Sequence, residues 1–443
     1  MRLGCGTFST VCFDAIGFSM QFVSAVQWVR VLVRLKGFQK LTPVDEALRI
    51  FFDALRIKKP RAESVSLDSA LNRVLAEPVV AREDLPRVDR SAVDGYAVIA
   101  EDTVGASQFK PKMLTLTDRN VVTDKQARQL WTGNPVPKGA DAVMMLENTK
   151  QVGNQIEIWT PLAVSENVSR KGEDVKKGET ALAFGIRLKP QHLGMLAALG
   201  ITEVKVYERP KVAILATGNE LVEIGSTRRS DQVFDVNRHV VSALCKELGA
   251  EPVDLGIVKD DFDEILGKLK DGLGSDMVIT TGGTSVGGSD LVPEAVSKLG
   301  KPGVLVHGVA MRPAMPTALA AVEGKPVLVL SGNPVAAMFG FEVFAKPLLS
   351  RLQGLAQDET RPTVEARMSR KATGALGRRT YLRVLVSRKE KGFVAEPISA
   401  RGSGILSTMT KANGYVIIPE NREGLREGET VSVHLLDNIG VAD

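Results

Sequence analysis

The chain has 443 residues, too many for one ordinary hydrophobic core, so several domains are expected. With 44% hydrophobic and 25% charged residues, the composition excludes a disordered protein. The net charge of +5 slightly favours anionic ligands, but basic residues are spread along the chain without interleaved aromatics, which argues against nucleic acid. Three cysteines and four histidines show no metal or disulfide spacing, which favours a reducing compartment, and we expect a cytoplasmic protein.

The N-terminal segment is unusual because Asp14 is the only charge between Leu3 and Val29. Polar residues interrupt this apolar run and basic residues follow it, so a membrane anchor and a signal peptide both fit poorly. Globular patterning begins near Phe38. We expect residues 1–37 to be an N-terminal extension outside the fold, and we expect no membrane partner.

Helices and short strands alternate in blocks over the next part of the chain. Thr42 as N-cap and Pro43 at the first helical position predict a helix through residues 44–55, and a second helix is predicted over 66–76. Short strands with glycines and prolines then run to about residue 161, and helical patterning returns before Gly200. We predict a small helical or mixed domain from residues 38–82 and 162–208, with a β domain of residues 83–161 inserted in it.

Strand and helix alternate strongly from residue 209 to residue 355. Apolar strand-like runs are followed in turn by amphipathic helical segments, and a long helix begins at Pro334. This alternation predicts a three-layer α/β/α domain with a mostly parallel sheet covered on both faces. Beyond it, short strands and turns in residues 360–443 predict a C-terminal β barrel or sandwich. The fold class is therefore α/β multidomain.

Three glycine-containing turns follow predicted strands of this α/β domain, at residues 216–220, 280–290 and 330–334. Ligands bind at the carboxyl ends of strands in an open parallel sheet. Glycines let backbone N–H groups converge on an anion, and neighbouring hydroxyl groups add donors, so the second turn suits a phosphate. Its candidate residues are Gly282, Gly283, Thr284, Ser285 and Gly287. Turns that merely close tight strand–helix connections are the alternative, which is weaker for three turns on one edge.

Charged residues surround these turns. Glu220, Asp260 and Asp290 follow strand ends, and carboxylates beside a phosphate site suggest an intervening Mg²⁺. Asp260 and Asp290 also suit helix N-caps, a role compatible with metal binding. Arg312 lies in a proline-rich turn and has the geometry to bind an oxyanion bidentately, although an exposed arginine with no ligand is the simpler interpretation.

Three turn-rich segments of the β domain carry an acid or a hydroxyl group, namely Asp94, Thr132 and Asp174. Each segment by itself is more typical of turn chemistry than of a functional site.

Six segments in a fixed order carry a resemblance: SAVDGYA, TGNPVPKGADAV, KGEDV, TGNE, GGTSVGGSD and SGNPVAA. They are similar to the molybdopterin molybdenumtransferase family, MoeA, which includes the E domain of gephyrin, and the similarity runs from about Phe38 to the C-terminus. The resemblance implies a molybdopterin-binding α/β domain among four subdomains and a homodimer with a shared active site. It also implies Mg²⁺-dependent insertion of molybdate (or tungstate) into adenylylated molybdopterin, with release of AMP.

The resemblance assigns site residues motif by motif. The six positions that it implies to be catalytic are Asp94, Thr132, Asp174, Glu220, Asp260 and Asp290, of which the last three would hold Mg²⁺. Substrate would be bound by the glycine-rich turn, by Arg312 and by the last loop, Ser331, Gly332, Asn333 and Pro334.

Four positions depart from the family pattern. Asn219 stands where many members have aspartate, Ala314 and Met315 replace a common glycine and lysine, and Ser331 replaces a frequent proline. These differences affect the expected metal and oxyanion binding rather than the expected fold.

Two other functions are weighed against the transferase. A molybdopterin adenylyltransferase consists essentially of the α/β domain, whereas here the flanking β domains carry motifs of their own. A scaffold protein of the gephyrin kind would need a second α/β domain and a long linker, neither of which the sequence contains.

Overall fold

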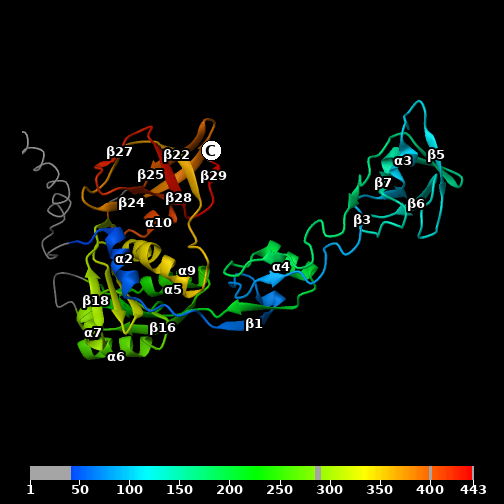
Figure 1. The fold of residues 1–443 in the computed structure, drawn as a ribbon. Helices are drawn as coiled ribbons and strands as arrows, with labels where there is room; N and C mark the ends of the chain where they lie inside the picture. Colours follow the sequence, from blue (N-terminus) through cyan, green and yellow to red (C-terminus); the bar gives the residue numbers. More distant parts are fainter. Residues whose placement is uncertain (1–40, 285–290, 399–401, 442–443) are drawn as a thin grey trace, which may run out of the picture. The chain divides into compact units, whose positions relative to one another are not determined.

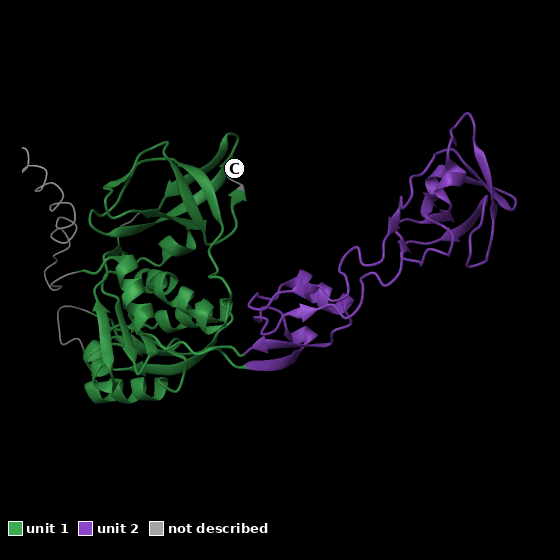
Figure 2. Cartoon of the chain, viewed as in Figure 1, with its two compact units in different colours: residues 1–61, 208–443 green, residues 62–207 purple. Residues whose placement is uncertain are grey.

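A computed structural model describes residues 41–284, 291–398 and 402–441. The chain divides into two compact units (Figures 1 and 2): unit 1 comprises Met1–Arg61 and Glu208–Asp443, and unit 2 comprises Ala62–Tyr207. Each unit has hydrophobic cores of its own. Within the described ranges, no helix combines the length and the apolar character that a bilayer span requires.

The centre of unit 1 is a six-stranded sheet in the order β16-β13-β17-β21-β20-β18. The first four strands are parallel, and β20 runs antiparallel to both of its neighbours. In sheet order, the strands span Glu251–Val258, Lys211–Thr217, Met277–Thr281, Lys325–Leu330, Ala318–Val322 and Pro302–His307. The prediction of a mostly parallel sheet is confirmed.

Helices cover both faces of this sheet because its strands are apolar on both faces. Val212 and Ile214 of β13 pack in a core with α2, α5 and the continuous helix α8–η3–α9, whereas Ala213 and Leu215 pack with α6 and α7. Helices α2, α5 and α9 lie on one side of the sheet, and α6 and α7 lie on the other (Figure 1). The helices are α5 Asn237–Glu247, α6 Phe262–Gly272, α7 Leu291–Leu299, α8 Pro334–Gly340, the π-helical η3 Phe341–Ala345 and α9 Lys346–Leu352. The predicted three layers are therefore present.

Helix α2 spans Val44–Ala54 and belongs to unit 1. Its buried face, with Ala47 and Phe51, packs in the same core as β13 and α5, and not with the segment after residue 62 with which the sequence grouped it. The predicted cap is one residue too early. Thr42 is held extended by backbone hydrogen bonds to Gly308 and Ala310, so Pro43 is the N-cap.

The C-terminal part of unit 1 is a closed five-stranded barrel, as the neighbouring pairs β24–β25, β25–β22, β22–β28, β28–β26 and β26–β24 show. The short strand β19, Met311–Arg312, pairs with the start of β24 and joins the proline turn to the barrel. Barrel strands β22, β24, β25, β26 and β28 span Thr363–Met368, Arg379–Lys389, Gly392–Pro397, Gly414–Ile418 and Thr430–Leu435.

Unit 2 contains a six-stranded sheet in the order β7-β4-β6-β5-β9-β8, a two-stranded sheet of β1 and β12, and the short helices α3 and α4. The large sheet spans Ala142–Met145, Gly95–Val98, Gln126–Leu130, Lys112–Leu116, Gln155–Ile158 and Thr149–Val152 in that order. The other elements are β1 Ala62–Ser66, β12 Glu203–Tyr207, α3 Ala100–Thr103 and α4 Pro190–Ala198.

The helix predicted over residues 66–76 is wrong. A short 3-10 helix, Leu67–Ser69, replaces it, and Asn72 has a left-handed backbone with φ of 63° that ends helical geometry. The backbone amides of Leu75 and Ala76 donate to the carbonyls of Ile186 and Lys205 instead of to their own segment. Long-range pairing therefore overrides the helical pattern.

Short elements complete the description. They are β2 Val79–Val80, β3 Arg90–Ser91, η2 Leu146–Asn148, β10 Val168–Ser169, β11 Thr180–Leu182, β14 Leu221–Val222, β15 Val233–Phe234, β23 Ala372–Thr373, α10 Ser407–Thr410, β27 Gly424–Leu425 and β29 Gly440–Val441.

Candidate active site

The loops that follow β13, β17 and β21 meet at one edge of the sheet and enclose a cavity of about 970 Å³. Parallel strands bring their carboxyl ends to the same edge, which is why turns far apart in sequence converge here. The Gly282 amide donates to the Leu330 carbonyl at 3.0 Å. The cavity is lined by, among others, Thr217, Gly218, Glu220, Asp235, Asn237, Asp260, Gly282, Gly283, Thr284, Ser331, Gly332, Asn333 and Pro334.

The Glu220 carboxylate lies directly against the backbone of Gly218. A Cβ atom on Gly218 would lie 2.7 Å and 2.9 Å from the two carboxylate oxygens, and the φ of Gly218 is 155°. Glycine at this position therefore makes room for the acid as well as permitting the turn.

Asp260 lines the same cavity as Glu220. Its backbone amide donates to Oδ1 of Asn219 at 3.2 Å, so the Asn219 carboxamide holds the turn that carries Asp260. Asp261, the next residue, is the N-cap of α6 and accepts from the Glu264 amide. The interpretation of Asp260 as a helix cap is therefore wrong, since its neighbour fills that role.

The glycine-rich turn is packed tightly where the structure describes it. A Cβ atom on Gly282 would lie 2.3 Å from the Thr217 carbonyl oxygen, and one on Gly283 would lie 2.4 Å from Cγ2 of Val292. Both glycines have left-handed backbones, with φ of 97° and 66°. Three predicted site residues, Ser285, Gly287 and Asp290, lie outside the described residues.

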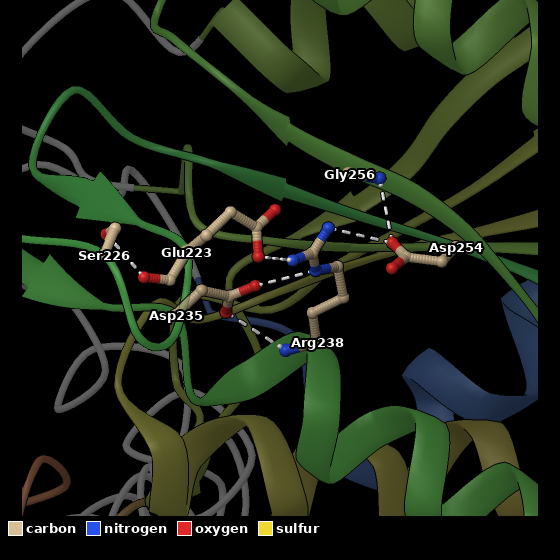
Figure 3. Close-up of polar contacts among 6 residues, drawn as sticks. All are labelled: Glu223, Ser226, Asp235, Arg238, Asp254 and Gly256. Atoms are coloured by element: carbon tan, nitrogen blue, oxygen red, sulfur yellow. Dashed lines mark hydrogen bonds and ion pairs between the residues drawn. The ribbon is translucent and has the colours of Figure 1, made fainter.

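Sequence reasoning missed a charged cluster around the buried side chains of Arg238 and Asp235, beside the cavity (Figure 3). The Arg238 guanidinium pairs with Asp235, Asp254 and Glu223 at 3.0, 3.0 and 2.6 Å. Asp235 also accepts from the backbone amide of Arg238. These bonds tie the segment after Glu220 to the first turn of α5 and to β16. The signal in the sequence is weak, because an acid three residues before an arginine is common on surface helices.

The last loop is bound to its neighbours through its backbone. The Asn237 side chain donates to the Gly332 carbonyl at 2.7 Å, and the Val335 amide donates to the Ser403 carbonyl at 3.1 Å. Oγ of Ser331 accepts from the Asn333 amide at 3.2 Å. Serine at this departing position therefore stabilises the turn itself.

A second cavity of about 350 Å³ adjoins the first, and Met315, Pro316, Ser331 and Asn333 line both. Three arginines line it: Arg312 from the proline turn, and Arg378 and Arg383 from the region of β24. Burial, followed by the nearby positive charge of Arg312, lowers the pKa of Arg378 and of Arg383. Three partly or fully buried cations that line one cavity favour an anionic ligand. Sequence reasoning found the first arginine and missed the other two.

Two positions at which the resemblance leads us to expect other residues lie in this cavity wall. Ala314, where glycine is expected, has a left-handed backbone with φ of 71°, a conformation that favours glycine. Nη1 of Arg378 lies 3.9 Å from the sulfur atom of Met315, where lysine is expected. A cation from the barrel thus lies beside the position of the expected lysine.

The predicted β-domain residues lie in unit 2. Oδ1 of Asp94 accepts from the backbone amide of Thr132 at 2.7 Å and from its hydroxyl group at 2.8 Å, and these bonds, the backbone one first, lower the pKa of Asp94. Asp174 is exposed, and its carboxylate makes no hydrogen bond or ion pair with any residue that the structure describes. The structure therefore joins Asp94 to Thr132, and no hydrogen bond or ion pair among the described residues joins Asp174 to either of them.

Fold and site together define an α/β ligand-binding protein with anion-suited cavities at the carboxyl ends of parallel strands. Three family models match the chain: the MoeA N-terminal region (domains I and II) over residues 42–200, the "Probable molybdopterin binding domain" over 213–351 and the MoeA C-terminal region (domain IV) over 365–436. The chain belongs to the MoeA family.

Similar proteins cover most of the chain. The molybdopterin molybdenumtransferase of Staphylococcus aureus strain COL is 35% identical over 89% of this chain and 96% of its own length. A Methanocaldococcus jannaschii protein with a provisional molybdopterin-biosynthesis name is 38% identical over 91% of this chain and 100% of its own. The solved structure of a Pyrococcus horikoshii molybdopterin biosynthesis MoeA protein matches with a TM-score of 0.72 and 34% identity, over 89% of this chain and all of that one.

Proposed function

We propose that this protein is a molybdopterin molybdenumtransferase of molybdenum cofactor biosynthesis, which inserts molybdate (or tungstate) into adenylylated molybdopterin and releases AMP. One observation carries the proposal. A large cavity with a glycine-rich turn and carboxylates shares a wall with a smaller cavity lined by three arginines. A phosphorylated substrate and a separate oxyanion need such a pair of adjoining sites. Close relatives that carry this enzyme name support the choice of substrates.

The oxygen donors at the large cavity fit Mg²⁺. Glu220 and Asp260 both line it, and carboxylates leave room for the several water molecules that Mg²⁺ keeps. Among the described residues, no three His, Cys, Asp or Glu side chains gather as a complete ligand set. Asp290, outside the described residues, is the proposed third ligand. When bound, the metal would polarise the phosphoanhydride of the adenylylated substrate.

The protein's own contribution is placement. The glycine-rich turn, with the backbone amide of Gly283, would bind the terminal phosphate of the pterin, whereas Arg312, Arg378 and Arg383 would hold the oxyanion. Neither His nor Cys occurs among the described residues that line the two cavities, which fits a mechanism without a protein nucleophile. Most of the rate enhancement would come from charged groups and hydrogen-bond donors placed to stabilise the transition state.

Asp94, Thr132 and Asp174 belong to unit 2, and we assign them to a site completed by the partner chain of a homodimer. A cytoplasmic location fits a biosynthetic enzyme whose cysteines show no disulfide spacing.

The experiment is an assay of purified protein with adenylylated molybdopterin and Mg²⁺. We expect AMP release and loss of the adenylylated pterin when molybdate is present, and little of either without it. Consumption that ignores molybdate contradicts the proposal, and net formation of adenylylated pterin from ATP would indicate an adenylyltransferase. Tungstate in place of molybdate measures which oxyanion is preferred.

The same assay also tests the role of the arginine-lined cavity. Arg378→Met should raise the KM for molybdate about tenfold or more, because a charged hydrogen bond to an anion is lost. Arg370→Met is the matched control, since Arg370 does not line the cavity and donates to the carbonyl of Pro397.

A further inference from the structure

Asn237 begins α5 at the wall of the large cavity and is 7% exposed. Its Nδ2 atom donates to the Gly332 carbonyl at 2.7 Å. A carbonyl oxygen accepts and cannot donate, so this bond determines which end of the carboxamide is the nitrogen. Oδ1 is consequently turned away from Gly332. It is buried and has no hydrogen-bond partner among the described residues.

A buried acceptor without a partner destabilises the folded protein, so proteins keep one mainly where something else satisfies it. The side chain has little freedom to seek another partner. The neighbouring Arg238, 5% exposed, anchors the first turn of α5 through its bonds to Asp235, Asp254 and Glu223 (Figure 3). The carboxamide of Asn237 is therefore fixed in place in a residue of the cavity wall.

The chemistry of Oδ1 selects its ligand. It accepts hydrogen bonds only, so it disfavours the oxygen atoms of phosphate or molybdate, which are acceptors as well. Phe234, Val236 and Pro334 line the same cavity and present apolar surface. An acceptor beside apolar walls suits a flat heteroaromatic ring with an amino group.

We propose that Asn237 is a specificity-determining residue that accepts a hydrogen bond from an amino group on the heteroaromatic part of the substrate. The inference rests on the proposed function, whose substrate carries two such groups, the 2-amino group of the pterin and the 6-amino group of adenine. Both share the same chemistry, and the experiment distinguishes them.

Binding is measured by calorimetry with Mg²⁺ on the full-length protein, using two ligand pairs. One pair is AMP and the purine ribonucleotide without a 6-amino group. The other is 6-hydroxymethylpterin and its 2-deaminated counterpart. In one pair, the wild-type protein should prefer the amino-bearing member about tenfold, the value of one hydrogen bond. The pair that shows the preference identifies the group that Asn237 binds.

Asn237→Ala should remove this preference by weakening the amino-bearing ligand alone. Asn237→Asp keeps an acceptor but loses the donor to Gly332, so it should keep the preference even if the loop is disturbed. Asn219→Ala is the matched control, because the Asn219 carboxamide already accepts from the Asp260 amide, and it should change both members of a pair alike. Circular dichroism confirms that each variant is folded.

Equal weakening of both members by Asn237→Ala would mean that Asn237 only holds the Gly332 loop, and the proposal would be wrong. It is also wrong if the wild-type protein shows no amino preference in either pair. Failure of the proposed function has a different result: the wild-type protein would not consume adenylylated molybdopterin in response to molybdate, whatever the two ligand pairs show.

Discussion

At the scale of single residues, the site depends on where side chains are missing as much as on where they are present. Gly218 leaves space that the Glu220 carboxylate occupies, and Gly282 and Gly283 leave space for Thr217 and Val292. Ala314 shows the opposite case, since its methyl group is buried in the core although its φ of 71° suits glycine. These glycines position their neighbours, because the neighbouring atoms occupy the space that a side chain would fill.

Gly218→Ala should displace the Glu220 carboxylate, because the new methyl group would lie within 3 Å of its oxygens. We expect AMP release at ordinary Mg²⁺ to fall at least tenfold and the Mg²⁺ concentration for half-maximal activity to rise, since the proposed metal ligand would be misplaced. A Mg²⁺ titration of the molybdate-dependent assay measures both.

Gly225→Ala is the control for backbone strain alone. Gly225 has φ of 83° and open space around the position of a Cβ atom, so strain without displacement should cost about 1 kcal/mol of stability and leave activity nearly intact. Unchanged Mg²⁺ dependence in Gly218→Ala would contradict the assigned role of Glu220.

At the scale of elements, a buried charged cluster joins the helix after β21 to the barrel. Glu342 in η3 accepts two hydrogen bonds from Arg361, at 2.7 and 2.8 Å, and others from Lys346 and Tyr415. Burial by itself would raise the pKa of Glu342, but the bonds to Arg361 and Lys346 outweigh it and hold that pKa below its ordinary value. The ion pairs therefore stabilise the charged form of a buried acid.

Arg361→Met should lower the free energy of unfolding by about 3 kcal/mol at pH 7, because Glu342 keeps its charge with weaker compensation. A carboxylate with a lowered folded-state pKa stabilises above its unfolded pKa, and this contribution is lost as pH falls through the folded value. The difference between wild type and variant should hold from pH 7 to about pH 5 and narrow below about pH 4.3.

Urea unfolding at several pH values measures this difference. Arg49→Met, which breaks the exposed pair of Arg49 and Asp53, should cost under about 0.5 kcal/mol. A similarly small cost for Arg361→Met would show that the buried cluster contributes little.

At the scale of the whole molecule, each site is assembled from distant parts of the chain. The arginine-lined cavity takes Arg312 from the α/β part and Arg378 and Arg383 from the barrel, which β19 and β24 join by pairing. We propose that unit 2 contributes Asp94, Thr132 and Asp174 to a site through the partner chain of a homodimer. This proposed sharing has the largest functional consequence at this scale, because neither chain would then form a complete site by itself.

Co-folding equal amounts of Asp94→Ala and Asp290→Ala chains tests the shared site. If each site takes Asp94 from one chain and Asp290 from the other, every mixed dimer has one intact site. Random pairing makes about half of the dimers mixed, so roughly a quarter of wild-type activity should return. No recovery above the single variants, with mixed dimers confirmed by mass spectrometry, contradicts a shared site.

Local pattern by itself determined the α/β architecture and the position of the large cavity. Alternating strands and helices specify a parallel sheet, and the carboxyl ends of its strands converge, so the sequence alone groups Glu220, Asp260 and the glycines. The same reasoning failed for the helix over residues 66–76, where backbone bonds to Ile186 and Lys205 are long-range and leave no local trace.

Only the tertiary structure decided which side chains join these turns. Arg378 and Arg383 lie more than sixty positions beyond Arg312 in the chain, and barrel closure brings them to its cavity. In the sequence, Asn237 is an ordinary polar residue at the start of a helix. In the structure, its Nδ2 atom donates to the Gly332 carbonyl, and its Oδ1 atom is buried without a hydrogen-bond partner among the described residues. Sequence periodicity predicts which face of a helix or strand is buried. The polar partners of a side chain at a site depend instead on how loops from different elements meet, which periodicity does not describe.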